Sequence, residues 1–196
     1  MLSVVIPTEN AERALVPTLA ALVPGAMAGV VREVIVADAG SSDATAMIAD
    51  AAGCRIDVLA APLGQRLRQA AAGARSDWLL FLRAGAVPDR TWVDETRRFI
   101  EQAEMGGHSD RRAAAFRRTQ DVETLGAAII QGLGLIAAAL GAAPRPQQGL
   151  LISKMLYERA GGHLDGDADP EGKLLRRLGR RRIVMLRSRA LMAAAR

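Results

Sequence analysis

The chain contains the stretch Val34-Ile35-Val36-Ala37-Asp38-Ala39-Gly40-Ser41-Ser42-Asp43-Ala44-Thr45, an apolar run that ends in an aspartate and continues into small residues. The run predicts a buried strand, and the small residues predict a turn into a helix over residues 42–52, with Ser41 or Ser42 as its N-cap. In α/β proteins, a carboxylate at the carboxyl end of a strand and beside a helix N-terminus is a common place for a bound nucleotide. With Ser3–Asn10 upstream, this stretch predicts a ligand site within the first 45 residues.

The same alternation of apolar runs and helical patterns extends on both sides of this stretch. Short continuous apolar runs predict strands, and apolar residues spaced three and four apart predict helices. The strands predicted in the first half are 2–6, 31–37, 55–59 and 78–82, and the helices are 11–22, 42–52 and 64–74. After Pro88 we expect helices over 88–105, 154–160 and 172–178, and strands over 113–117, 148–152 and 183–186. Strands that alternate with helices argue for a parallel, doubly wound sheet.

The composition is that of one domain with an aliphatic core. The 196 residues are 50% hydrophobic but only 3% aromatic, so Ala, Leu, Val and Ile must fill the core. The single cysteine, Cys54, excludes an internal disulfide and is expected to be a small buried apolar residue. A net charge of +5 with clustered arginines suits anionic partners such as nucleotide phosphates or a lipid surface. The shortage of aromatic side chains that stack on bases argues against a nucleic-acid partner.

Two segments bear on the location of the protein. The N-terminus runs directly into Leu2–Ile6 without a basic region or a cleavage site, so we expect a cytoplasmic protein. Leu125–Ala143 is apolar except for Gln131 and is about long enough to span a bilayer. Its four glycines and its one-sided charged flank favour a core or interfacial helix over a span. With the arginines, this segment predicts at most peripheral contact with the inner face of a membrane.

Three stretches carry a resemblance to a known family: Ser3–Asn10, Arg32–Thr45 and Ser76–Leu82. A looser fourth stretch is Gly149–Gly179. Through these stretches, almost from end to end, the chain resembles the family-2, inverting glycosyltransferases of the GT-A fold, and among them the short bacterial type.

The resemblance implies a fold as well as an activity. It implies a single α/β domain over residues 1–196, with a mostly parallel central sheet and helices on both faces. The nucleotide-binding half would be residues 1–87, and the acceptor-side half would be residues 88–196.

The resemblance also implies roles for residues that follow the predicted strands. Pro7 and Thr8 would line the nucleoside pocket, and Asp38 would accept a hydrogen bond from the base. A carboxylate at this point favours uracil, because the ring N–H of uracil is a donor. Gln65 and Arg66 would lie near the ribose or the phosphates. The alternative role for Asp38 is that of a turn-forming residue that binds its own backbone.

The metal motif of the family is altered in this chain. Family members carry an acidic motif after the strand that corresponds to Trp78–Leu82, and its carboxylate binds Mg²⁺ or Mn²⁺ at the sugar diphosphate. Here the segment is Arg83-Ala84-Gly85-Ala86, whose side chains contain no oxygen. We therefore expect no divalent cation and no other cofactor. Arg83 is the candidate to replace the metal, because a guanidinium pairs well with a diphosphate.

The catalytic base of the family comes from an acidic pair ahead of an Arg-Arg-Leu segment. Counting from Gly161-Gly162 places that pair at Pro170-Glu171, so Glu171 would remove the proton of the acceptor hydroxyl. The alternative role for Glu171 is that of a surface carboxylate at the start of a basic helix, where it interacts with the helix dipole.

Two functions are compatible with these residues. The first is transfer of a sugar, with inversion, from a nucleoside-diphosphate sugar of the UDP type to an unknown hydroxyl acceptor, without a metal. The second is a catalytically inactive relative that binds a nucleotide or a partner, because two acidic motifs of the family are eroded in one chain.

Overall fold

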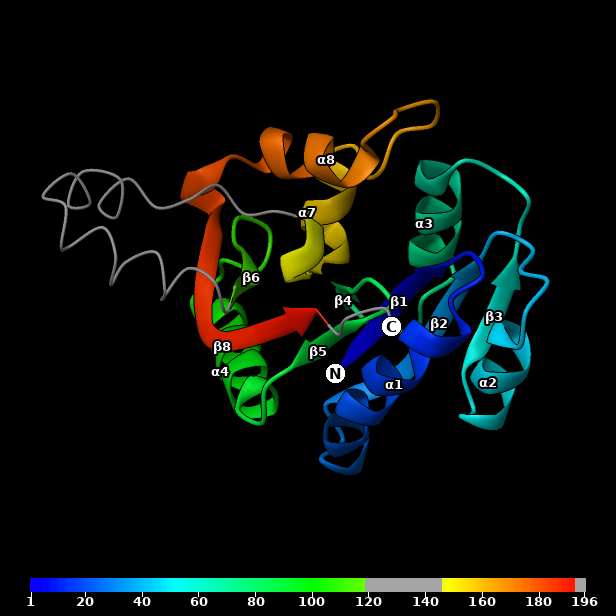
Figure 1. Ribbon diagram of the computed structural model, residues 1–196. Coiled ribbons are helices and arrows are strands. Elements are labelled where there is room, and N and C mark those ends of the chain that lie inside the picture. Colours follow the sequence, from blue (N-terminus) through cyan, green and yellow to red (C-terminus); the bar gives the residue numbers. More distant parts are fainter. Residues whose placement is uncertain (119–145, 193–196) are drawn as a thin grey trace, which may run out of the picture.

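The computed structural model describes residues 1–118 and 146–192, and its centre is an eight-stranded sheet (Figure 1). The strands are β1 (Leu2–Thr8), β2 (Val31–Asp38), β3 (Arg55–Val58), β4 (Trp78–Phe81), β5 (Ala86–Pro88), β6 (Ala113–Arg118), β7 (Leu150–Ser153) and β8 (Ile183–Met192). Their order in the sheet is β3-β2-β1-β4-β7-β6-β8-β5.

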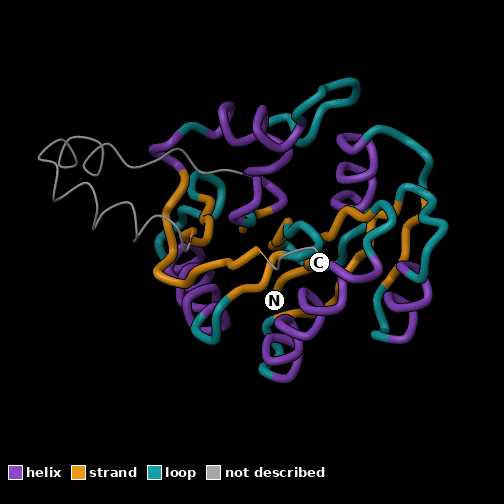
Figure 2. Tube along the Cα trace, in the orientation of Figure 1, coloured by secondary structure: helices purple, strands orange, loops and turns teal. Residues whose placement is uncertain are grey.

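Helices cover both faces of the sheet, as expected (Figures 1 and 2). The α-helices are α1 (Glu12–Met27), α2 (Thr45–Ala51), α3 (Leu63–Ala72), α4 (Trp92–Met105), α7 (Lys154–Arg159) and α8 (Pro170–Leu178), and the short 3-10 helices are η1 (Pro146–Gln148) and η2 (Arg180–Arg182). Residues of α1, α2 and α4 share one apolar core with Val4, whereas residues of α3, α7 and α8 share a second core with Val5. Successive side chains of a strand point to opposite faces, so β1 supplies both cores.

The first half of the chain forms a parallel sheet. Strand β1 pairs with β2 and with β4, and β2 pairs with β3, all in parallel. Strand β1 is buried on both faces, which explains why its sequence is a continuous apolar run rather than an alternating one. The strands predicted at 2–6, 31–37, 55–59 and 78–82 are therefore confirmed.

The second half of the chain adds antiparallel strands. Strand β7 lies antiparallel to both β4 and β6, and β8 pairs in parallel with β6 and antiparallel with β5. Four of the seven pairings among the described residues are parallel, so the domain is a mixed α/β fold with its parallel part at the N-terminal end. Strand β5 is missing from the sequence prediction, because three residues that end in a proline give no strand pattern.

Helix α2 begins later than its sequence predicts. Its N-cap is Ala44, which has no capping side chain, and neither Ser41 nor Ser42 takes that role. Both serines are used by the turn after β1 instead. Asn10 N donates to Ser41 Oγ (2.9 Å), and Ser42 N donates to Asn10 Oδ1 (2.9 Å). The predicted serine N-cap is therefore wrong, because tertiary partners of these serines compete with the helix end.

Two acidic side chains join the first turns of α1 and α2. Glu12 N donates to Asp43 Oδ2 (3.0 Å), and Ala44 N donates to Glu12 Oε2 (3.1 Å). Asp43 Oδ1 also accepts from Thr45 N (3.0 Å). Each carboxylate thus satisfies a free N–H group at the start of the other helix, or of its own, where negative charge is favourable.

Helix α1 continues past the predicted end and packs closely on α4. Gly25 lies against the indole of Trp92, where an added Cβ atom would be 2.4 Å from Cη2 of the ring. Trp92 is buried, and its Nε1 donates to Ala21 O (3.0 Å). The close approach of the two helices therefore depends on a glycine at this point.

The predicted helix at Leu125–Ala143 lies outside the described residues. Within residues 1–118 and 146–192, no helix has the length and apolar character that crossing a membrane requires. Peripheral contact with a membrane stays a prediction.

Candidate active site

The candidate site lies at the edge of the sheet where β1, β2 and β4 end. The strands are parallel, and the register pairs Thr8 with Asp38 and Val5 with Phe81. Their carboxyl ends therefore meet at one edge, as they do at the ligand sites of other open α/β sheets. Arg83 comes two residues after the end of β4 and joins the same edge.

Asp38 organises the turn after β2. Its side chain is 1% exposed and accepts four hydrogen bonds: from Thr8 Oγ1 (2.6 Å), Ser41 Oγ (2.6 Å), Ser41 N (2.7 Å) and Gly40 N (2.8 Å). Burial would raise the pKa of Asp38, but hydrogen bonds from Ser41, Thr8 and Gly40 outweigh it and hold the pKa below its ordinary value. The carboxylate is charged and has the turn-forming role that was its alternative; its contact with a base stays a prediction.

Arg66 fixes the ends of the two central strands. The side chain lies on α3 and the residue is 7% exposed. Its Nη1 donates to the carbonyl oxygens of Thr8 (2.8 Å) and Ala37 (2.9 Å), and its Nε donates to Ala61 O (3.2 Å). Arg66 therefore lies at the predicted edge, but these donors are directed at the protein backbone.

The other predicted nucleoside residues lie at the same edge. Pro7 is half-buried near the end of β1, and Thr8 is buried. Gln65 is exposed in the first turn of α3, next to Arg66. At this edge, the polar side chain of Gln65 is exposed and open to a ligand, whereas Asp38 and Arg66 are held in place by hydrogen bonds to the protein.

Arg83 and Glu171 form an ion pair, although 88 residues separate them in the chain. Glu171 lies in the first turn of α8, whose N-terminus is capped by Asp169 through a bond from Gly172 N to Asp169 Oδ1 (2.9 Å). The Glu171 side chain is 8% exposed and that of Arg83 is 38% exposed. The surface role considered for Glu171 does not describe this buried carboxylate.

One nitrogen of the Arg83 guanidinium has no hydrogen-bond partner among the described residues. Nη2 binds Glu171 Oε2, while Nε is buried and has no hydrogen-bond partner among the described residues. A buried donor without a partner costs about 1–3 kcal/mol. Because the Arg83 side chain is 38% exposed, an anionic ligand can reach the guanidinium, although not at the buried Nε.

Tyr157 and His163 are site residues that sequence reasoning missed. Both are buried, and Tyr157 Oη lies 2.9 Å from His163 Nδ1, beside the ring of Phe81. Burial, with help from nearby Arg177 and Arg68, lowers the pKa of His163 to about 3, so the imidazole is neutral. His163 and Glu171 line one small cavity between Phe81 and α8. No sequence pattern marks His163, because a histidine in a loop has no periodicity.

The side chains after β4 do not fit a divalent cation. Arg83 places a guanidinium where an oxygen ligand is needed, and Ala84 and Gly85 have no ligand atoms. Within the described parts of the chain, no group of three His, Cys, Asp or Glu side chains is arranged to hold a metal ion.

The sequence profile described as glycosyl transferase family 2 matches residues 3–122, which is more than half of the chain. The chain belongs to this family. Strands β1 to β4, apart from Leu2, and Arg83 lie inside the match, and Arg83 stands where the family has its acidic motif. Glu171 lies outside the match, so its predicted role as the base rests on the looser resemblance of Gly149–Gly179 and stays a prediction. A search of curated protein sequences finds no significant match.

Several solved structures resemble this fold. Glucosyl-3-phosphoglycerate synthase from Mycobacterium tuberculosis, in complex with phosphoglyceric acid, has a TM-score of 0.66 at 20% identity over all of this chain and 73% of that one. The same synthase in complex with Mn²⁺, UDP and glucosyl-3-phosphoglycerate has a TM-score of 0.64 at 22% identity, with the same coverage. The S. aureus protein TarS, residues 1–349, has a TM-score of 0.50 at 19% identity over 60% of this chain, which spans 35% of that structure. These likenesses show the GT-A type of fold.

Proposed function

We propose that this chain transfers a sugar from a nucleoside-diphosphate sugar, of the UDP type, to a hydroxyl acceptor with inversion and without a divalent cation. The observation that carries the proposal is the contact between Arg83 and Glu171. Sequence comparison alone had placed one at the diphosphate and the other at the acceptor hydroxyl. The fold brings them together beside the carboxyl ends of β1, β2 and β4. The synthase crystallised with UDP has the same fold, which supports a uridine nucleotide here.

In this mechanism the donor diphosphate competes with Glu171 for the Arg83 guanidinium. A diphosphate oxygen gains a charge-assisted bond from Arg83, and Glu171 is released as a free carboxylate. Glu171 then takes the proton of the acceptor hydroxyl while that oxygen attacks the anomeric carbon. The bond from the anomeric carbon to the diphosphate oxygen breaks, and its electron pair leaves with the nucleoside diphosphate. Arg83 stabilises the charge that develops on this leaving group.

The proposal is tested by measuring transfer or hydrolysis of UDP-sugars in the presence and absence of EDTA. We expect activity to persist in EDTA, Arg83→Ala to lower kcat by about 10²–10³-fold, and Glu171→Gln to lower it by about 10²–10⁴-fold. Arg90→Ala, which removes an exposed arginine elsewhere, serves as the control. Activity that disappears in EDTA, or that survives Arg83→Ala, contradicts the mechanism.

The second candidate is a nucleotide-binding relative without catalysis. The observation that favours it is again the ion pair, because Arg83 and Glu171 neutralise each other in this structure. Titration calorimetry with UDP and UDP-glucose separates the two. Binding with turnover supports the enzyme, and binding without turnover supports the inactive relative. If neither UDP nor UDP-glucose binds, a uridine nucleotide is excluded as the ligand in both candidate functions.

A further inference from the structure

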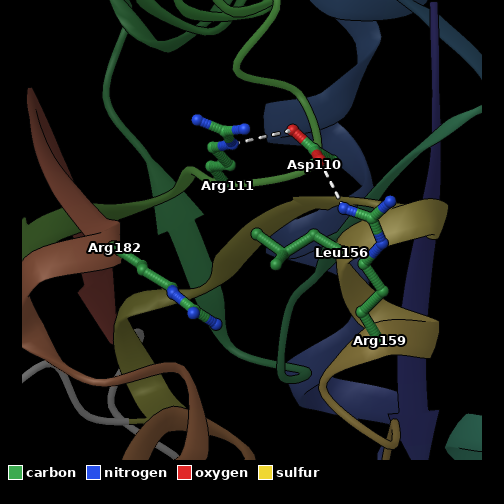
Figure 3. Close-up of a pocket in the computed structure, with 5 residues that line it drawn as sticks. All are labelled: Asp110, Arg111, Leu156, Arg159 and Arg182. Atoms are coloured by element: carbon green, nitrogen blue, oxygen red, sulfur yellow. Dashed lines mark hydrogen bonds and ion pairs between the residues drawn. The ribbon is translucent and has the colours of Figure 1, made fainter.

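The structure has a cavity of about 500 Å³ whose lining includes none of the predicted site residues. Figure 3 shows the side chains that line it. Its lining residues are Asp110, Arg111, Leu156, Arg159 and Arg182. They come from three segments: the loop before β6, helix α7, and η2 before β8. A volume of this size is within the range of sites for small molecules, about 300–1,000 Å³.

The cavity and the candidate active site lie at opposite edges of the sheet. Strand β7 is antiparallel to β4, so the end of β7, where α7 begins, lies beside the start of β4: Ser153 pairs with Trp78. The loop before β6 is at this same edge, because Ser153 Oγ donates to Ser109 O. The nucleotide residues, in contrast, follow the carboxyl ends of β1 and β2. A ligand in the cavity therefore does not occupy the proposed donor site.

An ion pair of Asp110 joins the loop before β6 to helix α7 at the cavity. Asp110 forms an ion pair with Arg159 of α7, and its other oxygen lies 3.8 Å from Arg111 Nε. A hydrogen bond from Arg159, and the charges of Arg159 and Arg111, lower the pKa of Asp110, which therefore stays ionised at neutral pH. Figure 3 shows Arg182 extending from the opposite wall toward the same space. One carboxylate thus pairs with two guanidinium groups, and a third arginine lines the same cavity.

The charge of the lining selects the kind of ligand. Three positive side chains and one negative side chain leave a formal charge of +2. A phosphate monoester carries a charge of about −1.5 to −2 at pH 7. Guanidinium groups bind phosphoryl oxygens with paired, charge-assisted hydrogen bonds. A carboxylate has one charge and two oxygens, and so leaves part of this lining without a partner.

We propose that this cavity binds a phosphoryl group, carried either by a free phosphorylated small molecule or by a lipid headgroup. Both sources present the same terminal oxygens to Arg111, Arg159 and Arg182. The site is separate from the proposed donor site and does not depend on sugar transfer.

The test compares the double variant Arg159→Gln/Arg182→Gln with the wild-type chain. Titration calorimetry at low salt, in the absence of nucleotide, uses inorganic pyrophosphate as the soluble probe. Flotation with phosphatidylcholine vesicles that contain phosphatidic acid tests the lipid headgroup. Arg90→Gln/Arg98→Gln is the matched control, because it removes two exposed arginines outside the cavity.

We expect the double variant to weaken binding of pyrophosphate, of the phosphatidic acid vesicles, or of both by at least tenfold. The probe that responds identifies the source. UDP binding should be unchanged, since the cavity is at the other edge of the sheet; if the chain does not bind UDP at all, the pyrophosphate titration is still decisive. The proposal is overturned if neither probe binds the wild-type chain, or if the control variant loses binding as much as the double variant does.

Discussion

The Arg83–Glu171 ion pair predicts an energetic coupling that can be measured without any substrate. The perturbations are Arg83→Ala, Glu171→Gln and the two together. Arg83→Ala leaves a carboxylate that is 8% exposed without its charged partner. Glu171→Gln leaves an arginine that is 38% exposed and that water can solvate. We therefore expect Arg83→Ala to be the more destabilising of the two single changes.

The magnitude follows from the burial of the two side chains. Breaking a fully buried ion pair costs about 3–5 kcal/mol, and an exposed pair contributes about 0.2–1 kcal/mol. Because Arg83 is more than a third exposed, solvent screens part of the attraction. The expected coupling free energy is about 1–2 kcal/mol, so the double variant should lose less stability than the sum of the single variants by that amount. In a chain of this length, this corresponds to about 2–8 °C in Tm.

The assay is urea denaturation of the wild type and the three variants. Their free energies of unfolding are compared with one common m-value, the slope of that free energy against urea concentration. The matched control is the pair Arg98–Glu95, whose atoms are 4.0 Å apart and whose arginine is 68% exposed. That control should show a coupling of at most about 0.5 kcal/mol. If the effects of Arg83→Ala and Glu171→Gln add to within about 0.3 kcal/mol, the two residues do not interact in solution, and the reasoning is refuted.

Three other predictions concern stability. Arg66→Met should destabilise the fold by about 2–4 kcal/mol in urea, because three carbonyl oxygens each lose one donor, although Thr8 O keeps its bond from Ala39 N. Arg66→Lys should recover part of the loss, and an unchanged midpoint for Arg66→Met would show that the strand ends do not need these bonds. The pKa of Asp38 in the folded protein is below its ordinary value of 3.8. The ionised carboxylate therefore stabilises the fold above pH 3.8, and this stabilisation is lost as the pH falls through the lower pKa of the folded state. Asp38→Asn should therefore lose less stability than the wild type when thermal melts are compared from pH 5 to pH 3, and parallel losses would contradict the assignment. Gly25→Ala should lower the free energy of unfolding by about 1–3 kcal/mol, since the new methyl group overlaps the Trp92 ring; Ala26→Gly, at an exposed position of the same helix, should cost about 1 kcal/mol.

The sequence predicted best where local pattern and tertiary environment agree. Strands β1 and β4 are buried on both faces, so their continuous apolar runs were sufficient to place them. The predicted start of α2 was wrong because Ser41 and Ser42 form hydrogen bonds with Asp38 and Asn10 instead of capping the helix. Strand β5 exists only through its pairing with β8, and three residues carry no such information.

The sequence predicted which residues belong to the candidate site, but not which of them contact each other. Arg83 and Glu171 were identified separately, and only the packing of α8 against the end of β4 brings them together. The burial of Arg66 could not be predicted either, since a charged residue on a helix is normally exposed. Its three carbonyl partners come from three different loops and strand ends, which no local pattern records.

The bonds that join the starts of α1 and α2 have a consequence for ligand binding. Glu12 and Asp43 each accept from the start of the other helix, and Asn10 and Ser42 join the two turns. The two loops after β1 and β2, at the candidate-site edge of the sheet, are therefore constrained to move as one body. Their conformational entropy is lost when the chain folds, not when a ligand arrives. Binding at this edge should therefore require little ordering of the backbone, and affinity there should depend on contacts alone.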